Sequence, residues 1–404
     1  MSDVERQPAA TETPAFLGGT PVRARMLPYG RQHVDESDIR AVTEALRGDW
    51  LTNGPTVARF EEAFATRVGA RFAVALSSGT AALHGAAAVA GLGPGDEVIL
   101  SPLTFLASAN CLLYCGAVPV FADIDPATLN LDPDRIEAAL SPRTKAILPV
   151  HFAGLPCAMD RLQAIARARG LCVIEDAAHA LGAEWGGRPI GGIGDLTTFS
   201  FHPVKHITTG EGGMVTTNEQ RLAEQLRRFR NHGIERQVRD RQGTWRQDMV
   251  AFGFNYRLTD IQSALGLSQL RRLDAGLARR EAIAAQYQAA FDRMRELLPA
   301  PAQPGTRHAW HIYPLRLRAE RLRKDRETVF RALRAENIGV NVHYLPVHLH
   351  PYYRERFGTD RGMCPAAEDA TDRLLTLPLF PQMSDEDVAD VVAAVCKVIR
   401  WARR

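Results

Sequence analysis

The sequence lacks the features that define several protein classes. Its apolar runs fall short of the ~18 residues that a membrane span needs, and the first residues, MSDVERQPAATETP, contain no apolar core of a signal peptide. The 49 basic and 46 acidic residues nearly cancel, without a basic block. Charge therefore gives no support for nucleic-acid binding, and we expect a soluble cytoplasmic protein that contacts neither nucleic acid nor membrane.

Metal and redox motifs are also missing. The six cysteines show neither a paired metal spacing nor a disulfide framework, and Cys111 and Cys115, four apart on an apolar stretch, read as core residues. No histidine belongs to an HExxH motif, and the chain has no GxxxxGK[ST] phosphate loop. We therefore expect no metal at the functional site.

What the sequence does contain is enough apolar material for two domains. Its 404 residues are 46% hydrophobic and 24% charged, the usual balance of a globular protein. We predict a mobile N-terminal tail over 1–20, where no periodicity is visible. A large domain over 21–275 and a small α+β C-terminal domain over 276–404 should follow.

Short β-rich runs alternate with helical stretches along the large domain. The runs are FAVAL at 72, EVILS at 97, PVFAD at 119, KAILPV at 145, CVIED at 172, TTFSF at 197 and GMVTT at 213. This alternation predicts an α/β fold with a mostly parallel seven-stranded sheet and helices on both faces. Ligands of such sheets bind beyond the carboxyl ends of the strands, so the chemistry should lie there.

Other elements are predicted around this sheet. Ile39, Val42 and Leu46 share one face of an amphipathic helix, and a long helical region covers 257–298. The small domain should contain strand-like HIYPLRL at 311, a helix near 326–336, strand-like GVNVHYL at 339 and a last helix from Asp385.

Three segments carry candidate chemistry at the ends of these strands. In SFHPVKHITTGEGG, Lys205 follows a strand, where an amine among apolar neighbours can lose its proton and condense with an aldehyde. A solvated surface lysine is the alternative. Asp176 ends the strand CVIED and can hold a pyridine nitrogen protonated, or simply cap a helix. Ser78, Gly79 and Thr80 lead from a strand into a helix, whose backbone donors can meet a phosphate.

Together these segments resemble the fold type I pyridoxal-phosphate (PLP) enzymes, in particular the DegT/DnrJ/EryC1/StrS sugar aminotransferases. The resemblance covers nearly the whole chain. Its landmarks, in order, are YGRQ at 29, DWLTNGP at 49, SSGTAALH at 77, SPLTFLASAN at 101, EDAAHALGA at 175, SFHPVKHITTGEGG at 200, NYRLTDIQSALG at 255 and VHYLPVHLHPYY at 342.

The resemblance implies a role for each matching position. Lys205 would be the Schiff-base lysine, Asp176 the partner of the pyridine nitrogen and His179 a contact of the cofactor's phenolic oxygen. Phe105 would stack on the cofactor ring, although core packing is an equal alternative. The implied phosphate contacts are Gly79, Thr80, the amide of Ala81, Ser200 and, from the neighbouring subunit, Asn255.

The same resemblance implies substrate contacts and an obligate homodimer with shared active sites. The implied substrate-binding residues are Tyr29, Trp50, Leu51, Thr52, Asn53, Thr80, Ser200, Asn255, His343 and Tyr344. His343 and Tyr344 could equally be a satisfied strand pair. Asn53 stands where LTQGP, with glutamine, is usual in the family.

Within the family the chain is most similar to the aminotransferases of pseudaminic acid biosynthesis. We therefore expect amino transfer, with L-glutamate as donor, to C4 of a UDP-linked 4-keto-6-deoxy-N-acetylhexosamine. A dTDP- or GDP-linked keto sugar is the alternative. A related PLP sugar dehydratase would have histidine at the position of Lys205, and a non-enzymatic regulator would need a DNA-binding segment that the sequence does not show.

Overall fold

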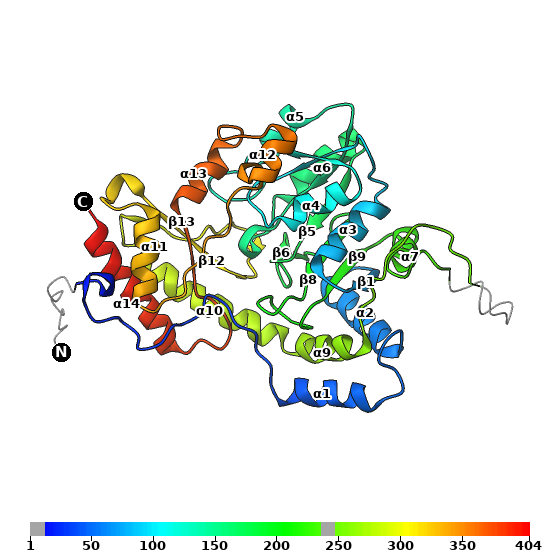
Figure 1. The fold of residues 1–404 in the computed structure, drawn as a ribbon, viewed down its shortest axis with the longest axis horizontal. Helices are drawn as coiled ribbons and strands as arrows, with labels where there is room; N and C mark the ends of the chain where they lie inside the picture. Colours follow the sequence, from blue (N-terminus) through cyan, green and yellow to red (C-terminus); the bar gives the residue numbers. More distant parts are fainter. Residues whose placement is uncertain (1–12, 236–246) are drawn as a thin grey trace.

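The computed structural model describes residues 13–235 and 247–404 (Figure 1). Most of the predicted mobile tail, residues 1–12, lies outside the described residues. Residues 13–20 include the short 3-10 helix Ala15–Leu17, whose Ala15 amide donates to the buried Glu336 carboxylate at 2.8 Å. The Lys397 ammonium donates to the carbonyl of Thr20 at 2.6 Å and to Glu336 at 3.0 Å. This part of the predicted tail therefore packs against the C-terminal region.

A seven-stranded sheet forms the centre of the large unit, as predicted. Its strand order is β1-β9-β8-β5-β4-β2-β3, and only β9 runs antiparallel to its neighbours. The strands are β1 Phe72–Leu76, β2 Glu97–Leu100, β3 Val118–Phe121, β4 Thr144–Leu148, β5 Cys172–Asp176, β8 Leu196–Ser200 and β9 Gly213–Thr217.

Helices cover both faces of this sheet because its strands are apolar on both sides. In β1, Ala73 and Ala75 belong to the core on one face, whereas Val74 and Leu76 belong to the core on the other. One face packs against α2 Pro55–Val68, α6 Met159–Arg169 and α9 Asp260–Arg271. The other packs against α3 Gly79–Val89, α4 Ala107–Tyr114 and α7 Gln220–Phe229. The predicted α/β architecture is confirmed.

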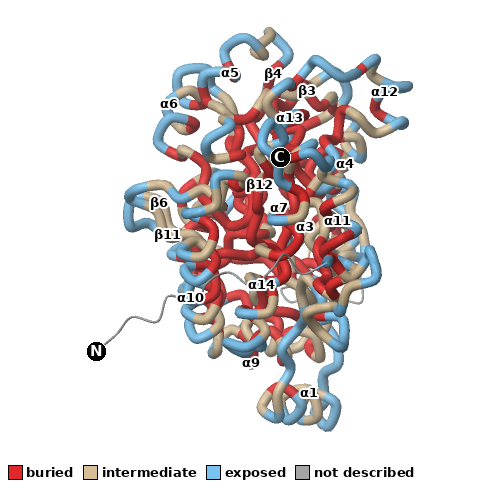
Figure 2. The backbone as a smooth tube through the Cα atoms, turned by 90° about the vertical axis from the view of Figure 1, so that its left-hand side faces the viewer, coloured by how far each residue is buried: buried red, intermediate tan, exposed pale blue. Residues whose placement is uncertain are grey.

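The first helix, α1 Glu36–Arg47, does not bury its apolar face within the chain. Ile39 and Leu46 are 50% and 55% exposed, and Asp38 is the buried residue of the helix. Asp38 accepts a hydrogen bond from Gln269 of α9 at 2.6 Å and pairs with Arg272. Polar contacts to α9 therefore dock this helix, which lies at the edge of the molecule with Asp38 as its one buried residue (Figure 2).

A second unit packs around a small antiparallel sheet. It contains β10 Leu297–Leu298, β12 Tyr313–Leu317 and β13 Leu374–Leu377, in the order β10-β12-β13. α11 Arg326–Ala335 and α14 Asp385–Ala402 cover this sheet. α10 Leu273–Phe291 contributes Leu277 to the large core and Tyr287 to the small one. The predicted boundary at 275/276 falls inside α10 and stays a prediction.

The strand predicted at 339–345 is wrong. GVNVHYL makes a single bridge, Asn341 to Thr376, and the third strand of the small sheet is β13. The Asn341 side chain accepts the Val342 amide at 2.8 Å, and residues 341–344 line a cavity. Local side-chain bonding of this kind competes with a strand ladder. Three further α-helices of the described residues are α5 Pro133–Ala139, α12 Pro351–Phe357 and α13 Pro365–Arg373, and the last of these leads directly into β13.

Candidate active site

A cavity of about 540 Å³ lies beyond the carboxyl ends of β5 and β8, where the sheet meets residues 341–344. This is the place predicted for ligands of a parallel sheet. Ten of the predicted site residues line it: Tyr29, Gly79, Thr80, Phe105, Asp176, His179, Ser200, Lys205, His343 and Tyr344.

Lys205 lies in the loop after β8, and its backbone amide donates to the carbonyl of His202 at 2.9 Å. Burial of the side chain lowers the pKa of Lys205 to about 8, and the nearby Asp176 carboxylate opposes that shift. At pH 7 about a tenth of this amine is therefore unprotonated and nucleophilic, far more than for an ordinary lysine. The alternative of a solvated surface lysine does not fit this position.

The lowered pKa predicts how fast cofactor-free protein captures PLP. At pH 7.5 a pKa of about 8 leaves about a quarter of Lys205 neutral, against roughly 0.1% for an ordinary lysine. The capture rate, followed by absorbance, should rise about tenfold between pH 6 and 7 and level off above pH 8. Free Nα-acetyl-lysine, whose side-chain amine is unmodified, is mixed with PLP as the control for the cofactor's own titration. A rate that follows the Nα-acetyl-lysine profile up to pH 10 would contradict the assignment.

Asp176 ends β5 and is held by several donors. The Ser108 hydroxyl donates to one carboxylate oxygen at 2.6 Å, and the Ala178 amide donates to the other at 3.0 Å. Ser108 is itself bonded to Thr104 at 2.7 Å. Asp176 caps no helix of the described chain, because residues 177–182 form turns. Its carboxylate is thus fixed at the cavity wall.

The N-terminus of α3 forms one side of the cavity. Ser78 is its N-cap, and the Ser78 hydroxyl accepts the amide of Ala81 at 3.0 Å. Ala81, predicted as a phosphate donor, therefore already has a partner and does not line the cavity. A Cβ atom at Gly79 would lie 2.7 Å from the Cβ of Ser200, so glycine permits the close approach of α3 to β8. Unpaired amides at such a helix start favour an anion.

His179 lies deep in the cavity wall beside a histidine that the sequence did not single out. Its Nε2 is 3.1 Å from the hydroxyl of Tyr344, and its ring centroid is 4.3 Å from that of His311. Burial, and next the positive charge of Lys205, hold the pKa of His179 well below its usual range. His311 stands inside an apolar run, and a polar residue in that run was the only sequence signal for it.

Aromatic side chains border the rest of the cavity. Phe105 is 56% exposed, and its ring centroid lies 6.0 Å from that of Tyr344. Tyr29 lies 5.4 Å from His343, ring to ring. His343 also bonds Thr376 at 2.9 Å, so it both anchors this segment and faces the cavity. Phe105 is thus free to contact a ligand and is not core.

Besides Ala81, five predicted residues do not reach this cavity of their own chain. Trp50 and Leu51 are 57% and 49% exposed, and Thr52 pairs with Thr259. Asn53 lines a different cavity, and Asn255 is exposed and pairs with Asn231. Their roles stay predictions.

The residues present fit PLP. Lys205 would supply an amine for its aldehyde, Asp176 a carboxylate for its ring nitrogen, and the start of α3 a set of amides for its phosphate. The Nδ1 atom of His179 is buried without a hydrogen-bond partner in this structure. When bound, PLP withdraws electrons from the carbon that exchanges the amino group.

Neither a metal site nor a membrane-spanning helix is found in the described residues. Within residues 13–235 and 247–404, no cluster of histidine, cysteine and acidic side chains could hold a metal ion. In the same ranges no helix is long and apolar enough to cross a membrane.

Comparison with known proteins identifies relatives over nearly the full chain. The sequence model of the DegT/DnrJ/EryC1/StrS aminotransferase family matches residues 32–396. The spore coat polysaccharide biosynthesis protein SpsC of Bacillus subtilis is 46% identical over 384 residues, which cover 94% of this chain and 99% of SpsC.

Solved structures agree. Helicobacter pylori PseC, an aminotransferase of pseudaminic acid biosynthesis, is 31% identical with a TM-score of 0.88 over 93% of this chain and 100% of PseC. Spr1654 of Streptococcus pneumoniae, solved in PLP and PMP forms, is also 31% identical, and its PLP form has a TM-score of 0.87 over 93% of this chain and 99% of that one. The chain therefore belongs to the DegT/DnrJ/EryC1/StrS aminotransferase family and is a PLP-dependent sugar aminotransferase.

Proposed function

We propose that this enzyme moves an amino group from L-glutamate to C4 of a UDP-linked 4-keto-6-deoxy-N-acetylhexosamine, in pseudaminic acid biosynthesis. The observation that carries the proposal is the single cavity that joins Lys205 and Asp176 to Tyr29, His343 and Tyr344. The similarity to PseC over 93% of the chain supports this choice of sugar. The similarity to SpsC supports a product used in a surface polysaccharide.

Each side chain has a defined task in this proposal. Lys205 takes the proton from the donor's carbon and later returns one to the sugar carbon, for which a pKa of about 8 is suited. Asp176 would keep the ring nitrogen of PLP protonated, and the amides at the start of α3 would hold its phosphate. His179, which its lowered pKa keeps neutral, would contact the phenolic oxygen, and Phe105 would contact the cofactor ring.

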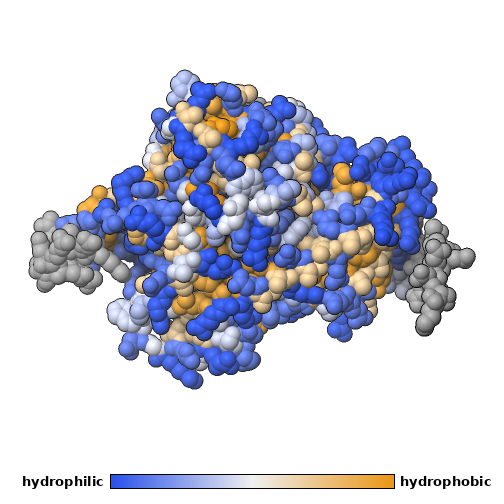
Figure 3. All heavy atoms as spheres, turned by 180° about the vertical axis from the view of Figure 1, so that it is seen from behind, coloured by the Kyte–Doolittle hydropathy of each residue, from blue (hydrophilic) through white to orange (hydrophobic). Residues whose placement is uncertain are grey.

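We also propose that the active enzyme is a homodimer with shared sites. The apolar face of α1 is uncovered, and Trp50 and Phe252 are 57% and 76% exposed. The face of the molecule drawn in Figure 3 also shows patches of hydrophobic residues among hydrophilic ones. Large exposed apolar areas favour an interface, and a second copy would place Asn255 at the neighbouring cavity. Each contact would then occur twice by symmetry.

Subunit complementation tests this sharing. Lys205→Ala and Asn255→Asp homodimers should both be inactive, the second because a carboxylate repels the cofactor's phosphate. After subunit exchange, a mixed dimer should contain one site with both defects and one site with neither. About half of the wild-type activity per mixed dimer is expected, and no recovery despite demonstrated exchange would place Asn255 in its own subunit's site.

The choice of sugar is tested with a substrate panel. Purified enzyme and L-glutamate are incubated with UDP-, dTDP- and GDP-linked 3-keto and 4-keto sugars. The masses of the products are then measured by mass spectrometry. The expected result is an amine at C4 of the UDP-linked 4-keto-6-deoxy-N-acetylhexosamine. Amination of only a dTDP- or GDP-linked sugar would contradict the nucleotide, and loss of a hydroxyl without a gain of nitrogen would indicate a dehydratase.

A further inference from the structure

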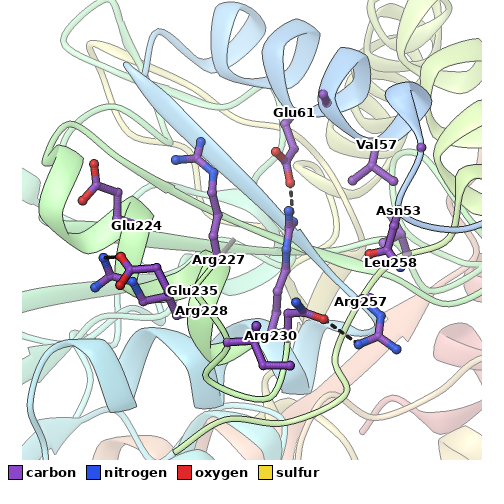
Figure 4. Close-up of a pocket in the computed structure, with 14 residues that line it drawn as sticks. Asn53, Val57, Glu61, Glu224, Arg227, Arg228, Arg230, Glu235, Arg257 and Leu258 are labelled. Atoms are coloured by element: carbon purple, nitrogen blue, oxygen red, sulfur yellow. Dashed lines mark hydrogen bonds and ion pairs between the residues drawn. The ribbon is translucent and has the colours of Figure 1, made fainter. Parts of the chain in front are cut away.

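A second cavity, of about 350 Å³, is lined by four arginines (Figure 4). We call it the arginine pocket, and its cationic residues are Arg227, Arg228, Arg230 and Arg257. The first three come from the end of α7 and the residue after it, and the fourth from the segment before α9. Asn53, a predicted substrate contact, lines this pocket and not the cofactor cavity of its own chain.

Two of these arginines are neutralised within the pocket. Arg230 pairs with Glu61 and also donates to the carbonyl of Ala75 at 2.7 Å. Arg228 pairs with Glu235 at 2.6 Å. The charges of both guanidinium groups are therefore compensated, and neither is free to bind an anion at full strength.

The other two arginines lack a carboxylate partner among the described residues. Arg257 donates to the side-chain oxygen of Asn231 at 2.7 Å, a neutral acceptor that orients the guanidinium without cancelling its charge. Arg227 is exposed and forms no ion pair in the described chain. The third carboxylate of the pocket, Glu224, accepts a hydrogen bond from Gln220 at 2.8 Å. Four arginines against three glutamates leave a net positive pocket.

The backbone fixes the direction in which Arg257 points. Phe254 and Tyr256 stack on each other, with centroids 5.0 Å apart, and both rings contact His84 of α3. In an extended segment alternate side chains point to opposite sides. Asn255 and Arg257 therefore project together, away from that aromatic cluster. Asn231 ties them together, since its backbone pairs with Asn255 and its side chain holds Arg257.

We infer that the arginine pocket, through Arg257 and Arg227, binds the diphosphate of the nucleotide sugar whose keto carbon lies in the partner subunit's cofactor cavity. The inference rests on the proposed function, which places Asn255 at that cavity. Two residues of extended chain span roughly 7 Å, so Arg257 would lie next to the cofactor's phosphate site. In a 4-keto sugar the diphosphate is on C1, across the ring from the reacting carbon. Asn231 orients the guanidinium of Arg257, which can then bind a phosphate group through bidentate hydrogen bonds.

Binding to the holoenzyme tests the anion. Calorimetry would measure UDP, inorganic diphosphate and uridine with wild type, Arg257→Gln and Arg221→Gln. Arg221 is a matched control, because it is an exposed arginine of α7 outside the pocket. Arg257→Gln should raise the Kd of UDP and diphosphate about 10- to 100-fold, as expected for the loss of a charge-assisted pair. It should leave the Kd of uridine unchanged. Arg221→Gln should change the Kd of UDP and diphosphate less than about twofold. Equal Kd values in Arg257→Gln and wild type, or equal losses in both variants, would overturn the inference.

A mixed dimer tests which subunit supplies Arg257. In a dimer of Arg257→Gln with Lys205→Ala, the one working cavity belongs to the Arg257→Gln subunit, and its partner keeps Arg257. KM for the nucleotide sugar should then be that of wild type, although the Arg257→Gln homodimer has a raised KM. A raised KM in the mixed dimer would place Arg257 in its own subunit's site and overturn the inference. The Kd values of UDP and inorganic diphosphate do not depend on which sugar the enzyme aminates. An error in the proposed sugar would therefore be recognised separately, by the substrate panel.

Discussion

Lys205→Ala should abolish turnover while the protein stays folded. In the proposed function this side chain is both the amine that bonds PLP and the base that moves the proton, so its loss should lower kcat by at least about 10⁴-fold. The start of α3, Ser200 and Asp176 remain to hold the cofactor without a covalent bond. The expected readouts are loss of the wild-type visible absorbance and of activity, with normal circular dichroism.

The lysine to which the cofactor is covalently attached can be identified directly. The chain has four lysines, at 145, 205, 324 and 397, so borohydride reduction followed by peptide mapping gives an unambiguous answer. Lys145→Ala is the matched control, because Lys145 is an exposed lysine of β4. It should keep wild-type activity and attachment. A reduced cofactor found on any lysine other than Lys205 would refute the assignment.

Asp176→Asn should keep the cofactor but lose most activity. Burial alone disfavours a protonated ring nitrogen, whereas an opposite charge in hydrogen-bond range can raise its pKa by ~1 to 3 units. The amide is nearly the same size and has no charge, so we expect kcat to fall about 10²- to 10³-fold with cofactor content near one per subunit. Absorbance gives the cofactor content, and a coupled glutamate assay gives kcat.

A second variant separates charge from geometry at Asp176. Ser108→Ala removes the 2.6 Å hydrogen bond to the carboxylate but keeps the charge. It should therefore cost much less activity than Asp176→Asn, within about tenfold of wild type. If Asp176→Asn turned over near normally, or if Ser108→Ala were equally impaired, the carboxylate's charge would not be what matters.

The fold and the place of Lys205 and Asp176 in one cavity followed closely from local sequence signals. The seven strands of the central sheet are runs of apolar residues, and burial on both faces leaves such a run few alternatives to a central strand. Asp176 and Lys205 follow strand ends, where a parallel sheet collects its ligands, so their meeting in one cavity was predictable. Local pattern and global position agree at these residues.

Other features depended on contacts between residues distant in sequence. His311 is 132 positions after His179 in the numbering, yet their rings lie 4.3 Å apart. The apolar face of α1 predicted burial, but Asp38 docks the helix on α9 through polar contacts instead. GVNVHYL reads as a strand, and its side chains form a cavity wall. In each case a tertiary contact overrode the local preference.

The sequence by itself determined the sheet and the positions of Lys205 and Asp176 at its carboxyl edge, because strand burial and strand ends are local properties that the chain order carries. The cofactor class followed from the resemblance of ordered motifs to a known family. Only the tertiary structure decided which side chains meet. It brought His311 to His179, tied the Ala81 amide to Ser78, and left Asn255 and Arg257 outside the cofactor cavity of their own chain. Those outcomes depend on how separate elements pack and on which polar atoms each finds as partners, and neither is encoded in any short stretch of sequence.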